Sequence, residues 1–374
     1  MRKFFQYLLR RPILWLSDKF SSRPDKERIY KALSKLHEDI ITEPGNKGVV
    51  ISLDDFDGRF VIFSDQHKGN RNGADDFTVA EASYMAALEH YEKNDFCFIN
   101  LGDCEELWEN LFWQVKKAYK KTFELEGKFL SKKAFIKIFG NHDLYWANDP
   151  LASFELENIY RQKIKVYEGV ILAGEINNHP LQILCTHGHQ GDANSDGNWF
   201  TKFFIARIWA PLQAYLHINP NEPSNNVYKK TLHNEIMYEW SATQKNMILI
   251  TGHTHQPVFE SLTHIERLHR QMRFAEAHKD EAMVAKINEE VKTYQKRFDT
   301  LEEDYAAIKP TYFNTGCCCF SDGDITGIEI ENGFIRLIKW QNKTAGPSRI
   351  VLEEKALADL VSDTGDRKDV PAKK

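Results

Sequence analysis

Five short apolar runs recur along the middle of the chain, and stretches with a helical pattern separate them. Short runs that are apolar throughout are typical of strands buried in a sheet with both faces covered. The runs and the residues that end them are FVIFSD at 60–65, FCFINLGD at 96–103, FIKIFGNHD at 135–143, LQILCTHGH at 181–189 and MILITGHTH at 247–255. Alternation of such strands with helices predicts an α/β fold.

Residues 263–309 carry a different pattern. Apolar positions there step by four and three, a seam of the kind that joins paired helices. A turn near Lys279 and a stop at Pro310 predict an antiparallel helical hairpin inserted into the domain. Downstream, the alternating stretch 327–340 reverses around Asn332-Gly333, a residue pair typical of a type I′ β-hairpin.

The N-terminal segment is basic and amphipathic. The pattern of residues 1–41 predicts helix with a break at Pro12. The first 20 residues contain five cations and a single acid, Asp18. Such a segment can lie on an anionic membrane surface, or it can pack its apolar face on the main domain, and both interpretations stay open. No uncharged run is long enough to span a bilayer, and no signal-peptide pattern is present. The expected location is cytoplasmic, with peripheral attachment to the inner face of the membrane as an open alternative.

These patterns divide the chain into three parts. The division is a basic amphipathic helical segment at 1–46, a main domain at 47–342 that contains the hairpin 263–309, and a polar, partly disordered tail at 343–374. The 374 residues carry 49 Lys and Arg against 54 Asp and Glu, a net charge of −5. A negative balance disfavours nucleic acid as a partner. The run Cys317-Cys318-Cys319 is poor material for a disulfide framework, which favours reduced thiols.

Metal-ligating residue types gather where the apolar runs end. The carboxyl ends of strands in an α/β sheet meet at one edge, so these residues should meet there too. The candidate ligands are Asp65, His67, Asp103, Asn141, His187, His253 and His255. This set exceeds what one tetrahedral ion uses and suits two adjacent divalent ions, with Asp103 as the bridge. Manganese is favoured, and iron or zinc would also suit these donors.

The same five motifs, in this order, resemble the signature of calcineurin-like metallophosphoesterases. They are Asp65-x-His67, Gly102-Asp103, the GNHD of 140–143, the His187 motif and the GHTH of 252–255, and the resemblance covers about 58–260 and 311–340. It implies a four-layer αββα sandwich, here with a helical N-terminus and the inserted hairpin.

The resemblance also implies roles for individual residues. One ion would be held by Asp65, His67 and His255, the other by Asn141, His187 and His253, with Asp103 bridging. Attack of a metal-bridging hydroxide would then hydrolyse a phosphate ester or pyrophosphate bond. His142 would stabilise the transition state or protonate the leaving oxygen, with Asp143 orienting it. His189 is a weaker alternative to His187 as ligand, or a substrate contact.

The substrate stays open at the level of sequence. The GDCEELWE of 102–109 resembles the UDP-2,3-diacylglucosamine diphosphatase branch of lipid A synthesis, which would suit a lipid-linked substrate at the inner membrane surface. His142 departs from that branch, many members of which carry Arg there. The stretches 104–134 and 198–242 form either a cap with an apolar wall and basic rim or helices that cover the sheet. A third hypothesis is a non-catalytic metal-binding scaffold that uses the hairpin to bind a partner.

Overall fold

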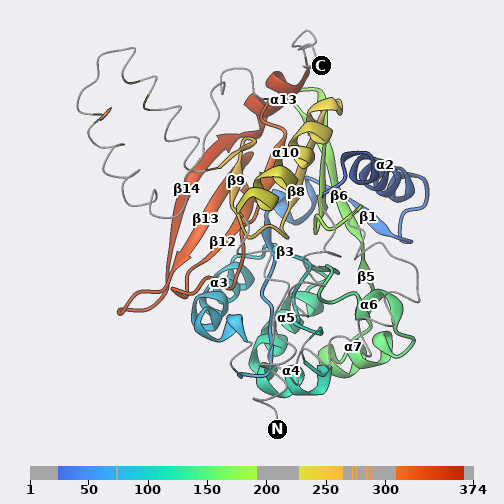
Figure 1. Ribbon diagram of the computed structural model, residues 1–374, viewed down its shortest axis with the longest axis vertical. Coiled ribbons are helices and arrows are strands. Elements are labelled where there is room, and N and C mark those ends of the chain that lie inside the picture. Colours follow the sequence, from blue (N-terminus) through green and yellow to red (C-terminus); the bar gives the residue numbers. More distant parts are fainter. Residues whose placement is uncertain are drawn as a thin grey trace, which may run out of the picture.

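Two seven-stranded sheets lie face to face at the centre of the computed structural model (Figure 1). The structure describes residues 24–72, 75–108, 110–191, 227–263 and 309–365, with five single positions between 272 and 287. In order across the first sheet, the strands are β1 (Gly48–Ser52), β6 (Gly169–Ile176), β7 (His179–Thr186), β8 (Met247–Thr251), β11 (Tyr312–Asn314), β9 (Val258–Phe259) and β10 (Leu262–Thr263). Across the second they are β14 (Ser348–Ala356), β13 (Phe334–Gln341), β12 (Ile325–Glu331), β2 (Phe60–Phe63), β3 (Cys97–Leu101), β4 (Phe135–Ile138) and β5 (Val166–Tyr167).

Helices cover the outer face of each sheet. The first sheet is covered by α2 (Lys26–Thr42) and α10 (Val227–Thr243). The second sheet is covered by α3 (Glu81–Lys93), α4 (Phe112–Ala118), α5 (Lys120–Ser131), α6 (Tyr145–Asn148) and α7 (Ala152–Tyr160), and α3 to α7 occupy the lower half of Figure 1. Short 3₁₀ turns at Asp55–Gly58 and Asp76–Val79 complete these connections. The order of layers is therefore helix, sheet, sheet, helix, as expected from the sequence.

Three apolar clusters hold the four layers together. The central cluster lies between the sheets and joins β2, β3 and β4 to β6, β7 and β8. On the first outer face, α2 contributes Ile29, Leu33, Leu36 and Ile40, spaced by three and four along one side of the helix. The second outer face is rich in rings, including Phe98 of β3 between the helices and the sheet. Each sheet is thus buried on both faces, which explains why its strands read as continuous apolar runs.

The five apolar runs are all strands, as predicted. The Asn332-Gly333 hairpin is also confirmed: Glu331 pairs with Phe334, and both turn residues have positive φ, 53° and 76°. The strands β1, β5, β6, β9, β10 and β14 were not predicted from the sequence. Within the part of the chain described, no helix is long and apolar enough to cross a membrane.

The C-terminal segment 343–374 was predicted to be a polar, partly disordered tail, but part of it is a strand and a helix. Residues 348–356 form β14, which pairs along its length with β13 and extends the second sheet. The helix α13 (Leu357–Gly365) follows, and Leu357, Leu360 and Val361 enter the cluster between the sheets. The polarity of β14 reflects its place at the sheet edge, where one side of the strand faces water.

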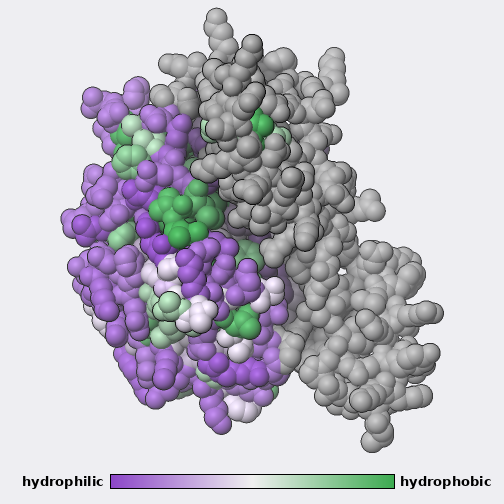
Figure 2. Space-filling model, turned by 90° about the vertical axis from the view of Figure 1, so that its left-hand side faces the viewer, coloured by the Kyte–Doolittle hydropathy of each residue, from purple (hydrophilic) through white to green (hydrophobic). Residues whose placement is uncertain are grey.

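Several predictions concern residues outside the described part of the chain. These include the basic segment 1–20, most of the predicted hairpin 263–309, and most of the second insertion, 198–226. The described part of one face of the molecule is mostly hydrophilic, with a hydrophobic area near its middle (Figure 2).

Candidate metal centre

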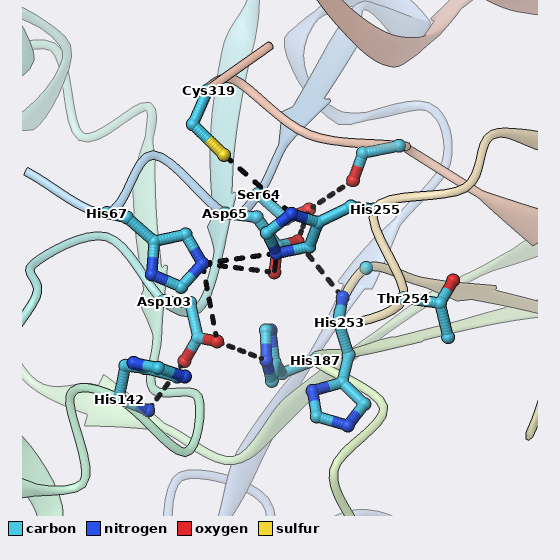
Figure 3. Close-up of polar contacts among 12 residues, drawn as sticks. Ser64, Asp65, His67, Asp103, His142, His187, His253, Thr254, His255 and Cys319 are labelled. Atoms are coloured by element: carbon cyan, nitrogen blue, oxygen red, sulfur yellow. Dashed lines mark hydrogen bonds and ion pairs between the residues drawn. The ribbon is translucent and has the colours of Figure 1, made fainter. Parts of the chain in front are cut away.

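Polar residues follow the carboxyl ends of five strands, and they meet at the edge where these strand ends of the two sheets lie together. The strands β2, β3 and β4 run parallel in one sheet, and β7 and β8 run parallel in the other. Because parallel strands end at the same edge, residues far apart in sequence reach one place. The predicted site residues gathered there are Asp65, His67, Asp103, Asn141, His142, His187, His253 and His255, most of them drawn in Figure 3.

One side of the cluster is built from Asp65, His67 and His255. The Nε2 atoms of the two histidines lie 3.2 Å apart. Asp65 Oδ1 lies 3.2 Å from the Nε2 atom of His255 and 3.8 Å from that of His67. Asp103 Oδ2 reaches this side as well, 3.9 Å from the Nε2 atom of His67. These four atoms face a common point.

The other side of the cluster shares Asp103 with the first. Asp103 Oδ2 lies 3.1 Å from His187 Nε2, which in turn lies 3.2 Å from Asn141 Oδ1. Ligand atoms of Asp103, His187 and His253 all lie within 4.8 Å of one another. Asp103 is therefore the carboxylate that contacts both sides, the position that the sequence assigned to the bridging ligand.

The backbone at this site is held in an unusual conformation. Asp65, His67, Asp103, His253 and His255 all have φ between 50° and 67°, in the left-handed region that residues other than glycine rarely adopt. Such positions cost of order 1–3 kcal/mol each and persist where the surrounding structure imposes them. Five of seven predicted ligands share this feature, which is typical of a functional site.

Close approach of the loops also requires glycine. A Cβ atom at Gly140 would collide with the Asp103 carboxylate, and one at Gly252 would collide with Ser64 and Asp65. These glycines stand beside the ligands in the GNHD and GHTH motifs because no larger residue leaves room for the carboxylates.

Two histidines of the cluster, His67 and His187, each have an acceptor for the ring nitrogen that faces away from the cluster centre. His67 Nδ1 donates to Glu106 Oε2 at 2.9 Å, and His187 Nδ1 donates to the Leu101 carbonyl at 2.9 Å. These contacts turn Nε2 of each ring toward the cluster. Sequence reasoning did not assign a role to Glu106, although its position three residues after Asp103 in GDCEELWE was the available signal.

Glu106 also contacts the predicted catalytic histidine. His142 Nδ1 lies 2.7 Å from Glu106 Oε2, and the His142 ring stacks on Trp108 with ring centroids 4.1 Å apart. Asp143, which the resemblance suggested as the partner of His142, instead accepts hydrogen bonds from the backbone amides of Cys104 and Gly140. By contact, the carboxylate that orients His142 is Glu106, and Asp143 fixes the loop that carries it.

The charged groups of the cluster shift one another's pKa. Burial alone would raise the pKa of Asp103, but the imidazoles of His187 and His142 hold it well below its ordinary value. Burial alone would lower the pKa of His187 and of His255, but Asp103 raises the first and Asp65 raises the second, each to about 9. The carboxylates thus create a strong local attraction for positive charge, which protons or divalent cations can satisfy.

The arrangement fits a metal centre. The Nε2 atoms of His67 and His255 face each other at 3.2 Å, and either a shared proton or a metal ion can occupy the space between them. The donors are carboxylate, amide and imidazole groups, which suit manganese, iron or zinc. Asp65, His67 and His255 would hold one ion and Asn141, His187 and His253 the other, with Asp103 serving both.

His189 lies beside this set. Its ring is buried, 5.4 Å from that of His187 and 5.9 Å from that of Phe139. The Nε2 atom that points at Asp103 and Asn141 is that of His187. Of the two histidines, His187 has the geometry of a ligand.

The two facing sheets carry a carboxylate and imidazole cluster at the carboxyl ends of their strands, where it can hold metal ions. The chain belongs to the calcineurin-like phosphoesterase family, whose model matches residues 58–257. Members of this family depend on two metal ions.

The similar chains that a comparison with solved structures found include two of low sequence identity. One is a single mutant of Vps29 from Entamoeba histolytica, with 13% identity and a TM-score of 0.28 over 79% of this chain and 99% of that one. The other is a dimetal phosphatase from Danio rerio, with 8% identity and a TM-score of 0.34 over 79% of this chain and 98% of that one. A comparison with curated protein sequences found no match.

Proposed function

We propose that the protein hydrolyses a phosphate ester of an alcohol, with two divalent ions held by the seven predicted ligands and manganese the favoured metal. Bound ions of this kind lower the pKa of water and neutralise charge on a phosphoryl group. A soluble phosphorylated small molecule is the simplest substrate of this class. The rest of the proposal concerns what the chain's own residues do.

The observation that carries the proposal is the Glu106–His142 pair beside the ligands. When His142 is protonated, its Nδ1 faces Glu106 at 2.7 Å, so the proton available for transfer is the one on Nε2. Stacking on Trp108 restricts rotation of the ring. An alkoxide leaving group needs such a proton, whereas the phosphate leaving group of a pyrophosphate does not. The pair therefore favours an ester over an anhydride.

Cleavage of a defined panel tests this proposal. The panel holds p-nitrophenyl phosphate, an alkyl phosphomonoester, a phosphodiester and a UDP-linked acylated sugar, each incubated with manganese and followed by phosphorus NMR. We expect turnover of the esters. His142→Asn should slow the alkyl ester by about 10²- to 10⁴-fold, the usual contribution of general acid catalysis. It should slow the nitrophenyl ester far less, because nitrophenolate leaves without a proton.

A second variant alters the same contact from the carboxylate side. Glu106→Gln keeps the shape of the side chain but weakens its contacts with His142 Nδ1 and His67 Nδ1, so it should lower both rates and lower that of the alkyl ester more. Equal losses on both esters in His142→Asn would contradict proton donation by His142. Metal binding without cleavage of any compound would favour the non-catalytic scaffold.

A lipid-linked pyrophosphate of the UDP-2,3-diacylglucosamine type is the second candidate. Large apolar side chains are exposed on the segment that continues from Trp108 and on neighbouring α7, where Leu111, Trp113, Leu151 and Phe154 are between 61% and 64% exposed. Lys116 of α4 reaches the Asn158 carbonyl of α7 at 3.5 Å, so the two helices lie side by side. Exposed apolar groups of this kind suit an amphiphilic substrate or a membrane surface.

Vesicle binding tests this second candidate separately. If the substrate lies at the inner membrane surface, the full chain should sediment with anionic vesicles, and deletion of residues 1–20 should abolish sedimentation. Preferential release of UMP from the UDP-linked sugar would also support a lipid-linked pyrophosphate as the substrate. Absence of vesicle binding, together with cleavage of the simple esters alone, would exclude it.

A further inference from the structure

The three consecutive cysteines after Gly316 have no role in the proposed reaction, yet they lie against the metal cluster. Their backbone is tied to it, because the Cys318 amide donates to the carbonyl of Asp65 at 3.1 Å. The Cys318 thiol contacts the Thr326 carbonyl at 3.9 Å and belongs to the apolar cluster on the outer face of the second sheet.

The thiols of Cys317 and Cys319 point the other way, toward His255. Cys319 Sγ lies 3.8 Å from His255 Nδ1 (Figure 3). Cys317 stands two residues earlier in the chain, and its thiol interacts with that of Cys319. Cys317 is 1% exposed, whereas Cys319 is partly exposed. The outer thiol can therefore meet a small solute, with the second thiol directly behind it.

At the neighbouring histidines, an oxygen acceptor lies beside Nδ1, and at His255 a thiol lies there instead. His67 is supported by the Glu106 carboxylate and His187 by the Leu101 carbonyl, each through Nδ1. His255 is supported at Nδ1 by sulfur. Such outer partners orient a ligating imidazole, and their loss usually weakens metal binding about 10- to 100-fold. Among these three supports, only the thiols can be oxidised reversibly.

We propose that Cys317 and Cys319 are a modification site at which hydrogen peroxide forms an intramolecular disulfide, and that this disulfide weakens metal binding through His255. The proposal rests on the function proposed above, because it requires His255 to be a metal ligand. Joining the two sulfur atoms would withdraw Cys319 from its 3.8 Å contact with the imidazole. The ring would then lose the acceptor that fixes its orientation.

The chemistry balances with peroxide as the oxidant. The sulfur of Cys319 attacks one peroxide oxygen, so that an S–O bond forms, the O–O bond breaks and water leaves with the thiol proton. The sulfur of Cys317 then attacks the sulfenic sulfur of Cys319, the S–S bond forms, the S–O bond breaks and a second water leaves. Two thiols are oxidised by two electrons and one peroxide is reduced. A dithiol such as dithiothreitol reverses the step.

The test uses the full chain loaded with zinc, which peroxide does not oxidise. Reduced protein is treated with hydrogen peroxide, the disulfide is located by peptide mass spectrometry, and zinc affinity is measured by competition with a chelator. We expect a Cys317–Cys319 disulfide and about 10- to 100-fold weaker binding of one of the two ions, restored by dithiothreitol.

Three variants make the outcome specific. Cys319→Ser removes the outer thiol, so its zinc affinity, whatever its starting value, should be insensitive to peroxide. Cys317→Ser should form no disulfide. Cys318→Ala, the matched control, should respond to peroxide like the wild type. A Cys317–Cys319 disulfide with unchanged zinc affinity, or no such disulfide at all, overturns the proposal. Failure of the reduced wild type to bind zinc would instead overturn the proposed function.

Discussion

Replacing Asp103 with Asn should reduce both metal content and turnover, the largest functional effect expected of any single change in this chain. Asp103 Oδ2 faces His187 Nε2 at 3.1 Å on one side and His67 Nε2 at 3.9 Å on the other. Asn keeps the shape of the side chain but removes the negative charge that both ions would share. Loss of a few kcal/mol of charge stabilisation corresponds to turnover about 10³-fold lower. Elemental analysis of bound manganese and initial rates on the ester panel measure the two effects.

Asp95→Asn is the matched control for this experiment. Asp95 has the same left-handed backbone, φ 56° against 50° for Asp103, but its side chain is 72% exposed and pairs with Lys132. This control should retain wild-type metal content and rate. A fully active Asp103→Asn protein with two bound ions would show that Asp103 is not the bridging ligand.

Replacing the buried Lys137 with Met should lower the free energy of unfolding substantially. Lys137 lies in the middle of β4 and is fully buried, as are Lys68, Glu105 and Glu126. Its Nζ contacts both carboxylate oxygens of Glu105, at 2.9 and 3.0 Å, and Lys68 Nζ lies 3.2 Å from Glu105 and 2.7 Å from Glu126. Removal of one partner from a buried ion pair usually costs 3–5 kcal/mol, so we expect a loss of about 4 kcal/mol in the free energy of unfolding.

Urea unfolding of metal-free protein measures this loss without a contribution from bound ions. Lys120→Met, which removes a surface cation paired with Glu124, serves as control and should change the unfolding free energy by less than about 1 kcal/mol. The double variant Lys137→Met/Glu105→Gln should recover part of the loss, because it removes the unpaired charge. Equal destabilisation by Lys120→Met and Lys137→Met would contradict a special role of the buried pair.

The buried ion pairs also link stability to the metal centre. Lys68 follows the ligand His67, and Glu105 precedes Glu106, so these pairs hold the two loops that carry His67 and its acceptor. Trp146 adds a hydrogen bond from Nε1 to Glu105 at 2.7 Å. We therefore expect loss of Lys137 to weaken metal binding as well as folding.

The sequence alone predicted five of the strands, the residues that gather at their ends and one turn, because each depends on local properties. An apolar run of the right length forms a buried strand, and parallel strands end at a common edge, so polar residues after Phe63, Leu101 and Ile138 had to converge. Asn332-Gly333 adopts positive φ easily, so the hairpin at that point follows from two residues.

Only the tertiary structure decided which groups support these ligands. Glu106 contacts His67 and His142, Asp143 binds backbone amides, and the thiols of Cys317 and Cys319 lie beside His255. Each contact joins loops that are distant along the chain, so it depends on how far the loops bend and which side chain fills the space between them. The same reason explains why residues 348–356, polar in sequence, became an edge strand: the free side of β13 supplied the partner that the segment could not provide itself.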